Sequence, residues 1–127
     1  MVRNRNGKVI MTLEKPDLQP VYEMGWKAPE RFKVKAADGV TDLYGVMWKP
    51  ADFDSTKVYP IISNVYPGPF FEYVPTRFTI NDVYNTRLAQ LGFIVITVGH
   101  RGVLQCVEGL YTYGYNNMRD YPLADDK

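Results

Sequence analysis

The chain has 127 residues, of which 46% are hydrophobic and 23% are charged, a composition typical of one modest globular domain. Lysine and arginine number 15 against 14 aspartates and glutamates, so the net charge of +1 gives no support to nucleic acid or an anionic membrane as the main partner. A single cysteine and a single histidine exclude an internal disulfide and a four-ligand Cys/His metal site, and we predict no cofactor.

No targeting or membrane-spanning segment is predicted. The longest strongly apolar run, 93–98, is far too short to cross a bilayer. The amino terminus carries charge but no apolar region follows it, so it is not a signal peptide. The protein is therefore either cytoplasmic, or this chain is an internal piece of a longer one.

The first 30 residues predict a hairpin and a connector. Asn6-Gly7 is a two-residue hairpin signal, and residues 8–13 follow it as a strand. The segment 14–30 has three prolines, which disfavour both a helix and a central strand. We expect a surface connector held by Trp26, with a domain boundary near residue 30.

Two antiparallel strands and then a buried strand are predicted next. Residues 31–36 alternate polar and apolar side chains, Asp38-Gly39 makes a turn, and 41–48 returns as the second strand. Residues 58–65 form an apolar run that ends at Tyr66 and a Pro-Gly-Pro turn. We expect the chain to be organised around this strand, because ligands bind at the carboxyl ends of strands in open α/β sheets.

A helix and another strand complete a βαβ unit. Thr79 and Asp82 predict a helix start, and Tyr84, Leu88 and Leu91 fall on one apolar face. Gly92 is placed to end the helix in the left-handed conformation. The run 93–98 is then a strand parallel to 58–65, with a right-handed crossover.

The predicted fold class is α/β: two antiparallel strands followed by a parallel βαβ unit. Because both parallel strands are apolar throughout, helices should cover both faces of the sheet. Only one complete helix is predicted. A glycine- and tyrosine-rich loop covers 103–117, and Pro122 starts a helix that is cut off at 127. We therefore expect an incomplete domain; the alternative is a homodimer that buries these surfaces against a second copy.

Six segments in this order resemble the start of the peptidase domain in the dipeptidyl peptidase IV branch of the prolyl oligopeptidase family. They are Gly25-Trp26-Lys27-Ala28-Pro29-Glu30-Arg31-Phe32, Ala37-Asp38-Gly39, Leu43-Tyr44-Gly45-Val46-Met47-Trp48-Lys49-Pro50, Tyr59-Pro60-Ile61-Ile62, Val65-Tyr66-Pro67-Gly68-Pro69 and His100-Arg101-Gly102. The resemblance covers nearly the whole chain. No one motif is decisive, but their order is fairly specific.

The resemblance implies a serine peptidase that joins a β-propeller to an α/β-hydrolase domain. Residues 1–30 would be the end of the propeller and the connector, and 31–127 the amino-terminal part of the hydrolase domain. The implied partners are a peptide substrate, the rest of the hydrolase domain and the propeller. The family is often extracytoplasmic, so a periplasmic or secreted location is implied.

Tyr66 matches the family's oxyanion-hole tyrosine. A phenol hydroxyl can donate a hydrogen bond to the anion formed in acyl transfer, and the flanking prolines restrain the backbone. Without the resemblance, the better reading is an aromatic plug at a strand end. Pro67 stands where the family often has alanine or glycine, which could shift the hydroxyl.

The catalytic nucleophile is absent. No G-x-S-x-G elbow occurs, and neither Ser55 nor Ser63 lies between suitable glycines. His100 precedes any such elbow and matches a non-catalytic family position, so we predict a structural role. Arg101 is predicted to anchor the following loop, with a solvated charge as the alternative.

Several other aspartate, cysteine and tyrosine side chains could be functional, but a structural role explains them at least as well. Asp120, Asp125 and Asp126 could indicate a metal or acid–base site, but charges near a helix start more often pair with its dipole. Cys106 has no neighbouring base and is predicted to be inert. Three loop tyrosines could line a substrate groove or simply pack the loop: Tyr111, Tyr113 and Tyr115. Residues 103–106 depart from the family's glycine and serine, which leaves the course of this loop open.

The sequence thus predicts a piece of a serine-type peptidase, inactive by itself. An acylaminoacyl peptidase or esterase of the same fold is an alternative that this sequence does not separate. A non-catalytic, dimeric binding module is a second alternative, which a well-defined dimer with cooperative melting would favour.

Overall fold

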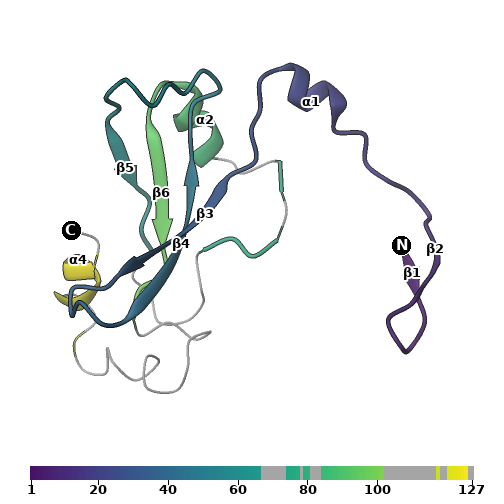
Figure 1. Cartoon of the computed structure of the whole chain (residues 1–127), viewed down its shortest axis with the longest axis horizontal. Coiled ribbons are helices and arrows are strands. Elements are labelled where there is room, and N and C mark those ends of the chain that lie inside the picture. The colour runs from purple at the N-terminus through teal and green to yellow at the C-terminus, as the bar shows by residue number, and fades with distance from the viewer. Residues whose placement is uncertain (67–73, 78, 81–83, 102–116, 118–119, 126–127) are drawn as a thin grey trace.

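A computed structural model describes residues 1–66, 74–77, 79–80, 84–101, 117 and 120–125. In the described part the elements in chain order are β1 (Val2–Arg3), β2 (Val9–Met11), α1 (Gln19–Glu23), β3 (Glu30–Lys35), β4 (Asp42–Trp48), β5 (Ile61–Ser63), α2 (Asn85–Gln90), β6 (Ile94–Val98) and α4 (Asp120–Asp125). They include a two-stranded sheet and a four-stranded sheet (Figure 1). Within these ranges, every helix is too short or too polar to cross a membrane.

The amino-terminal hairpin is confirmed, with a longer loop than predicted. Strands β1 and β2 pair antiparallel with an irregular register. The amide of Gly7 donates to the carbonyl of Asn4, so Arg5 and Asn6 are the central residues of the turn. Gly7 follows with a φ of 80°, the left-handed conformation that glycine adopts without strain. Figure 1 shows this hairpin on an arm that stands apart from the larger sheet.

The connector contains one helical turn, although its prolines predicted none. This turn, α1, begins at Gln19, and Pro20 lies in its first turn, where no intrahelical N–H bond is lost. Trp26 is buried, as expected of the residue that holds the connector. Its ring centroid lies 5.6 Å from that of Tyr22.

The four-stranded sheet has the order β3-β4-β6-β5. Strands β3 and β4 form the predicted antiparallel hairpin, closed by Gly39 at a φ of 71°. Strands β5 and β6 are parallel, as the βαβ pattern predicted. Strand β4 pairs antiparallel with β6. The sheet therefore joins an antiparallel hairpin to a parallel pair, and β6 lies between β4 and β5.

The prediction that the strand at 58–65 is the buried centre is wrong. Only Ile61–Ser63 forms regular strand, and β5 is an edge of the sheet. Val58 is 99% exposed and Ile61 is 63% exposed. The two inner strands are β4 and β6, and we call β6, where Val95 is fully buried, the central strand. An apolar run alone does not distinguish an edge strand from a central one, because burial depends on neighbours distant in sequence.

Helix α2 is shorter than predicted and buries a different face. It begins at Asn85 after Tyr84, so the prediction that Thr79 caps this helix is wrong; Asp82 lies outside the described residues. Tyr84 and Leu91 are 68% and 74% exposed, so they do not form the buried face. That face consists of Asn85 and Ala89, with Leu88 packed partly against the core. Gly92 ends the helix with a φ of 96°, as predicted.

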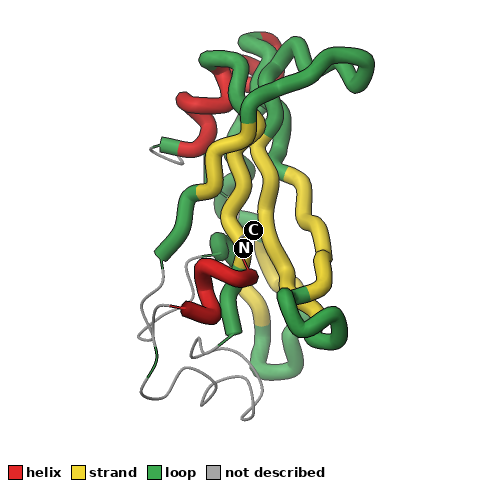
Figure 2. Tube along the Cα trace, turned by 90° about the vertical axis from the view of Figure 1, so that its left-hand side faces the viewer, coloured by secondary structure: helices red, strands yellow, loops and turns green. Residues whose placement is uncertain are grey.

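The core is divided between the two faces of the sheet. On one face Val46, Trp48 and Val95 pack with Ala89 of α2. On the other, Leu43 and Val98 pack with Ala36 and are joined by Phe32 and Ile96. Among the described elements α2 is the one helix that packs on this sheet, and Figure 2 shows it to one side of the strands.

Gly45 leaves room on β4 for the ring of Phe32, its cross-strand partner on β3. A Cβ atom at this position would lie 2.5 Å from the ring of Phe32 and 2.7 Å from the carbonyl oxygen of Thr97. The first neighbour is a packed aromatic ring and the second is backbone in the central strand. Neither can move without disturbing the core on the Phe32 face of the sheet.

Gly45→Ala is therefore expected to destabilise the chain by about 1–3 kcal/mol, the usual cost of overpacking. Urea unfolding followed by circular dichroism measures the change. Val34→Thr is the control, since this half-exposed position in β3 keeps a β-branched side chain. Equal stability of the alanine variant and the wild type would contradict the close approach at residue 45.

Candidate functional site

Tyr66 lies at the carboxyl edge of the parallel pair. It follows the last residue of β5 by three positions, and its side chain is partly accessible at 37% exposure. Because β5 and β6 are parallel, their carboxyl ends share one edge of the sheet, and the segment from Gly99 to Arg101 leaves β6 there. The structure thus places Tyr66 at the edge that the sequence predicted. Its role as an oxyanion donor stays a prediction.

Asn64 fixes the strand end before Tyr66 with three hydrogen bonds. Its amide donates to the carbonyl of Ile96 at 2.8 Å, and its own carbonyl accepts from the hydroxyl of Thr97 at 3.2 Å. Its side-chain amide donates to the Oδ1 atom of Asn85 at 2.7 Å. The end of β5 is therefore attached both to the central strand and to the first residue of α2.

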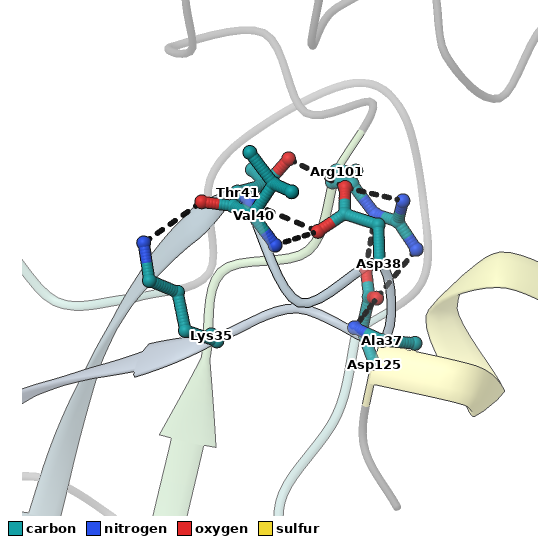
Figure 3. Close-up of polar contacts among 7 residues, drawn as sticks. All are labelled: Lys35, Ala37, Asp38, Val40, Thr41, Arg101 and Asp125. Atoms are coloured by element: carbon teal, nitrogen blue, oxygen red, sulfur yellow. Dashed lines mark hydrogen bonds and ion pairs between the residues drawn. The ribbon is translucent and has the colours of Figure 1, made fainter.

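Arg101 joins three parts of the chain beyond the end of β6. Its Nε and Nη2 atoms donate to the two carboxylate oxygens of Asp125 at 2.8 and 2.6 Å. Its Nη1 atom donates to Asp38 at 3.1 Å. Figure 3 shows the guanidinium between the two carboxylates. Arg101 is only 3% exposed, so the alternative of a solvated charge is wrong.

Asp38 organises the β3–β4 turn as well as pairing with Arg101. Its carboxylate accepts from the Thr41 hydroxyl at 2.6 Å and from the backbone amides of Thr41 and Val40. These bonds, above all the Thr41 hydroxyl, lower the pKa of Asp38 to about 2, with a smaller contribution from the Arg101 charge. A lowered carboxyl pKa favours the folded state above about pH 4, and this contribution is lost as the pH falls towards 2.

The contacts of the Arg101 cluster indicate a structural role. Asp125 also accepts the backbone amide of Ala37, and its side chain is fully buried. This aspartate is the last residue of α4, so its predicted pairing with the dipole of a helix start is wrong. Asp120, in the first turn, fits that prediction. In the described part of the chain, no three His, Cys, Asp or Glu side chains gather as a metal site would require.

The other candidate residues come from three different segments of the described structure. Ser63 ends β5, Ser55 lies in the preceding loop, and His100 is buried at 3% exposure. Five candidates lie outside the described residues, together with the loop that Arg101 was predicted to anchor: Cys106, Tyr111, Tyr113, Tyr115 and Asp126.

A cavity of about 270 Å³ lies between β4 and the segment 74–76, beside Gly99 and His100. Ligand pockets usually measure roughly 300–1,000 Å³, so this hollow is small for a substrate site. Tyr66 is not among the described residues that line it.

Sequence reasoning missed the polar residues that hold the strand end. Thr97 interrupts the apolar run 93–98, and Asn85 is the first polar residue of α2 after Tyr84. Both are buried, at 1% and 4% exposure. A polar side chain within an apolar strand signals a hydrogen-bonded partner, but the sequence does not reveal that this partner is Asn64.

Part of the chain is similar to dipeptidyl peptidases of the prolyl oligopeptidase family. Dipeptidyl peptidase 8 from Mus musculus is 36% identical over 83 residues, which are 65% of this chain and 9% of that protein. A dipeptidyl-aminopeptidase B from Aspergillus oryzae is 35% identical over 92 residues, which are 72% of this chain and 10% of that protein. No protein-family model matches the chain. The resemblance drawn from the motifs is confirmed.

The comparison with solved structures agrees with the sequence similarity. The crystal structure of a proposed dipeptidyl aminopeptidase IV from Bacteroides ovatus matches with a TM-score of 0.56 and 32% sequence identity. The match covers 72% of this chain and 13% of that one. The chain spans about a tenth of the length of the mouse and Aspergillus oryzae relatives. It therefore corresponds to a small part of such proteins.

Arg101→Ala is expected to destabilise the chain by about 3–5 kcal/mol, because it leaves the buried carboxylate of Asp125 without its counter-charge. Arg101→Lys is expected to restore only part of the loss, because an ammonium group cannot form the two parallel bonds. Thermal and urea unfolding measure both variants. Lys33→Ala, at an exposed ion pair with Asp42, is the control and should change little. A wild-type melting temperature for Arg101→Ala would contradict the structural role of the cluster.

Proposed function

We propose that this chain is the amino-terminal part of the catalytic domain of a serine peptidase related to the dipeptidyl peptidases to which it is similar. Its contribution to the reaction is Tyr66, as a hydrogen-bond donor in the oxyanion hole. The parent enzyme hydrolyses peptide bonds through an acyl-enzyme.

The position of Tyr66 is the observation that carries this proposal. The tyrosine lies at the carboxyl edge of β5 and β6, where open α/β sheets bind ligands. Its side chain is partly exposed, at 37%. The sequence similarity and the fold match to dipeptidyl peptidases support peptide hydrolysis as the reaction at this edge.

Acyl transfer requires a hydrogen-bond donor close to the carbonyl oxygen that is attacked. When a serine oxygen attacks the scissile carbonyl, negative charge develops on the carbonyl oxygen. A phenol O–H held about 2.7–3.1 Å from that oxygen stabilises the charge. Loss of one such donor typically lowers kcat by about 10²- to 10³-fold. The nucleophile, acid and histidine of the triad are contributed from outside these 127 residues.

The amino-terminal residues belong to a different domain in this proposal. Residues 1–30 are the end of a preceding β-domain and the connector. In support, the β1–β2 hairpin has contacts to no other described element, and it stands apart from the larger sheet in Figure 1. Residues 31–127 belong to the hydrolase domain, whose completion supplies further partners for the sheet.

The isolated chain is expected to show no peptidase activity, since neither of its serines lies in a nucleophile elbow. A chromogenic dipeptide substrate with the purified chain measures this directly. Human dipeptidyl peptidase 8, assayed alongside, is the positive control. Turnover by the isolated chain that a serine-directed inhibitor abolishes would contradict the proposal.

A chimera tests the role of Tyr66. In it, residues 31–127 of this chain replace the corresponding segment of human dipeptidyl peptidase 8. Tyr66→Phe in the chimera is expected to lower kcat by about 10²- to 10³-fold with little change in KM, because the lost bond forms only in the transition state.

Tyr44→Phe is the matched control, because Tyr44 is also exposed but lies in β4. It should leave kcat unchanged. Circular dichroism establishes that each variant is folded. A folded chimera without activity, or one in which Tyr66→Phe acts no more strongly than Tyr44→Phe, would overturn the assignment.

A further inference from the structure

A buried polar network connects α2 and β6 to the strand end that carries Tyr66. We propose that Asn85 and Thr97 are positioning residues that act through Asn64 to hold the Tyr66 hydroxyl at the oxyanion site. This inference rests on the proposed function of Tyr66. It assigns a role to two residues that do not touch the reacting atoms.

Burial makes the network unusual for simple core packing. Asn85 and Thr97 are 4% and 1% exposed, among apolar neighbours such as Ala89 and Val95. A buried amide or hydroxyl lowers stability unless it is hydrogen-bonded, and an apolar side chain would avoid that requirement. The Oδ1 atom of Asn85 and the hydroxyl of Thr97 both form hydrogen bonds with a single residue, Asn64.

The bonds to Asn64 come from two different elements. The central strand holds the backbone of Asn64 through Ile96 and Thr97, at 2.8 and 3.2 Å. The helix holds its side chain through Asn85, at 2.7 Å. Backbone bonds to one neighbouring strand leave the last residues of an edge strand free to twist. The side-chain bond to α2 opposes that twist because it attaches the strand end to a second element.

The network is close enough to Tyr66 to control it. Two residues of extended chain span at most about 7 Å, so the backbone of Tyr66 is displaced when Asn64 moves. An oxyanion donor works within a narrow range of distances, and a 1 Å misplacement can lower the rate about 10²-fold. Bonds that fix the strand end from two sides hold the Tyr66 hydroxyl within this range of distances. A surface tyrosine without a catalytic role has no need of such precise placement.

The test uses the 127-residue chain and needs no turnover. Tyrosine labelled with ¹³C at Cζ gives one NMR signal per tyrosine, and the signal of Tyr66 is identified by its loss in Tyr66→Phe. In the wild type we expect one sharp Tyr66 signal. In Asn85→Ala we expect that signal to broaden or split, with a shift towards that of an unfolded tyrosine.

Three further variants separate positioning from general stability. Leu88→Ala, on the same helix and packed against the same core, is expected to lower the melting temperature but leave the Tyr66 signal sharp. Asn85→Asp keeps an acceptor for the Asn64 amide and is expected to restore the sharp signal. If Asn85→Ala does not fold, Thr97→Val serves as the test variant, because it keeps the shape of the buried side chain and removes the hydroxyl bond.

An unchanged Tyr66 signal in folded Asn85→Ala or Thr97→Val would overturn the inference. So would equal broadening in Leu88→Ala, since that would reflect only general loosening of the core. The signal reports the order of Tyr66 without any reaction. Failure of the positioning role is therefore distinguishable from failure of the proposed function, which the kcat of the Tyr66→Phe chimera reports.

Discussion

The described structure depends on the two-sided pairing of β6. This strand lies between β4 and β5, and its Val95 is completely buried. Its side chains supply part of the core on each face of the sheet. Because one neighbour is antiparallel and the other parallel, β6 joins the hairpin of β3 and β4 to the βαβ unit. Its position also determines where Tyr66 and Arg101 lie.

Two polar networks lie where β5 and β6 end, at the carboxyl edge of the parallel pair. One holds Asn64, just after β5, and the other holds Arg101, just after β6. Arg101 uses charged bonds to Asp38 and Asp125, which tie the β3–β4 turn to α4. Asn64 uses neutral bonds to the central strand and to α2. Each network buries polar groups that would be costly if unpaired, so each specifies one arrangement of distant segments. A candidate site on this edge thus has hydrogen-bonded segments on both sides.

Most of the strand pattern could be predicted from local sequence. Alternation marked 31–36, and the Asp-Gly turn placed its antiparallel partner, because both signals act between neighbours in the chain. The burial of 58–65 was misjudged because an apolar run has the same appearance at the edge and at the centre of a sheet. The buried face of α2 was also misjudged. Its polar Asn85 is inside because of a partner 21 residues away.

The sequence by itself determined the strands, their turns, the parallel βαβ unit and the resemblance that singled out Tyr66. It determined these because propensity, hydrophobic period and motif order are local properties of the chain. Only the tertiary structure decided that β6 is central, that Arg101 is buried between two carboxylates, and that Asn64 connects β5 to α2. The carboxylate partners of Arg101 are 63 and 24 residues away in the chain. Contacts at such separations follow from the packing of the whole sheet, which no local pattern encodes.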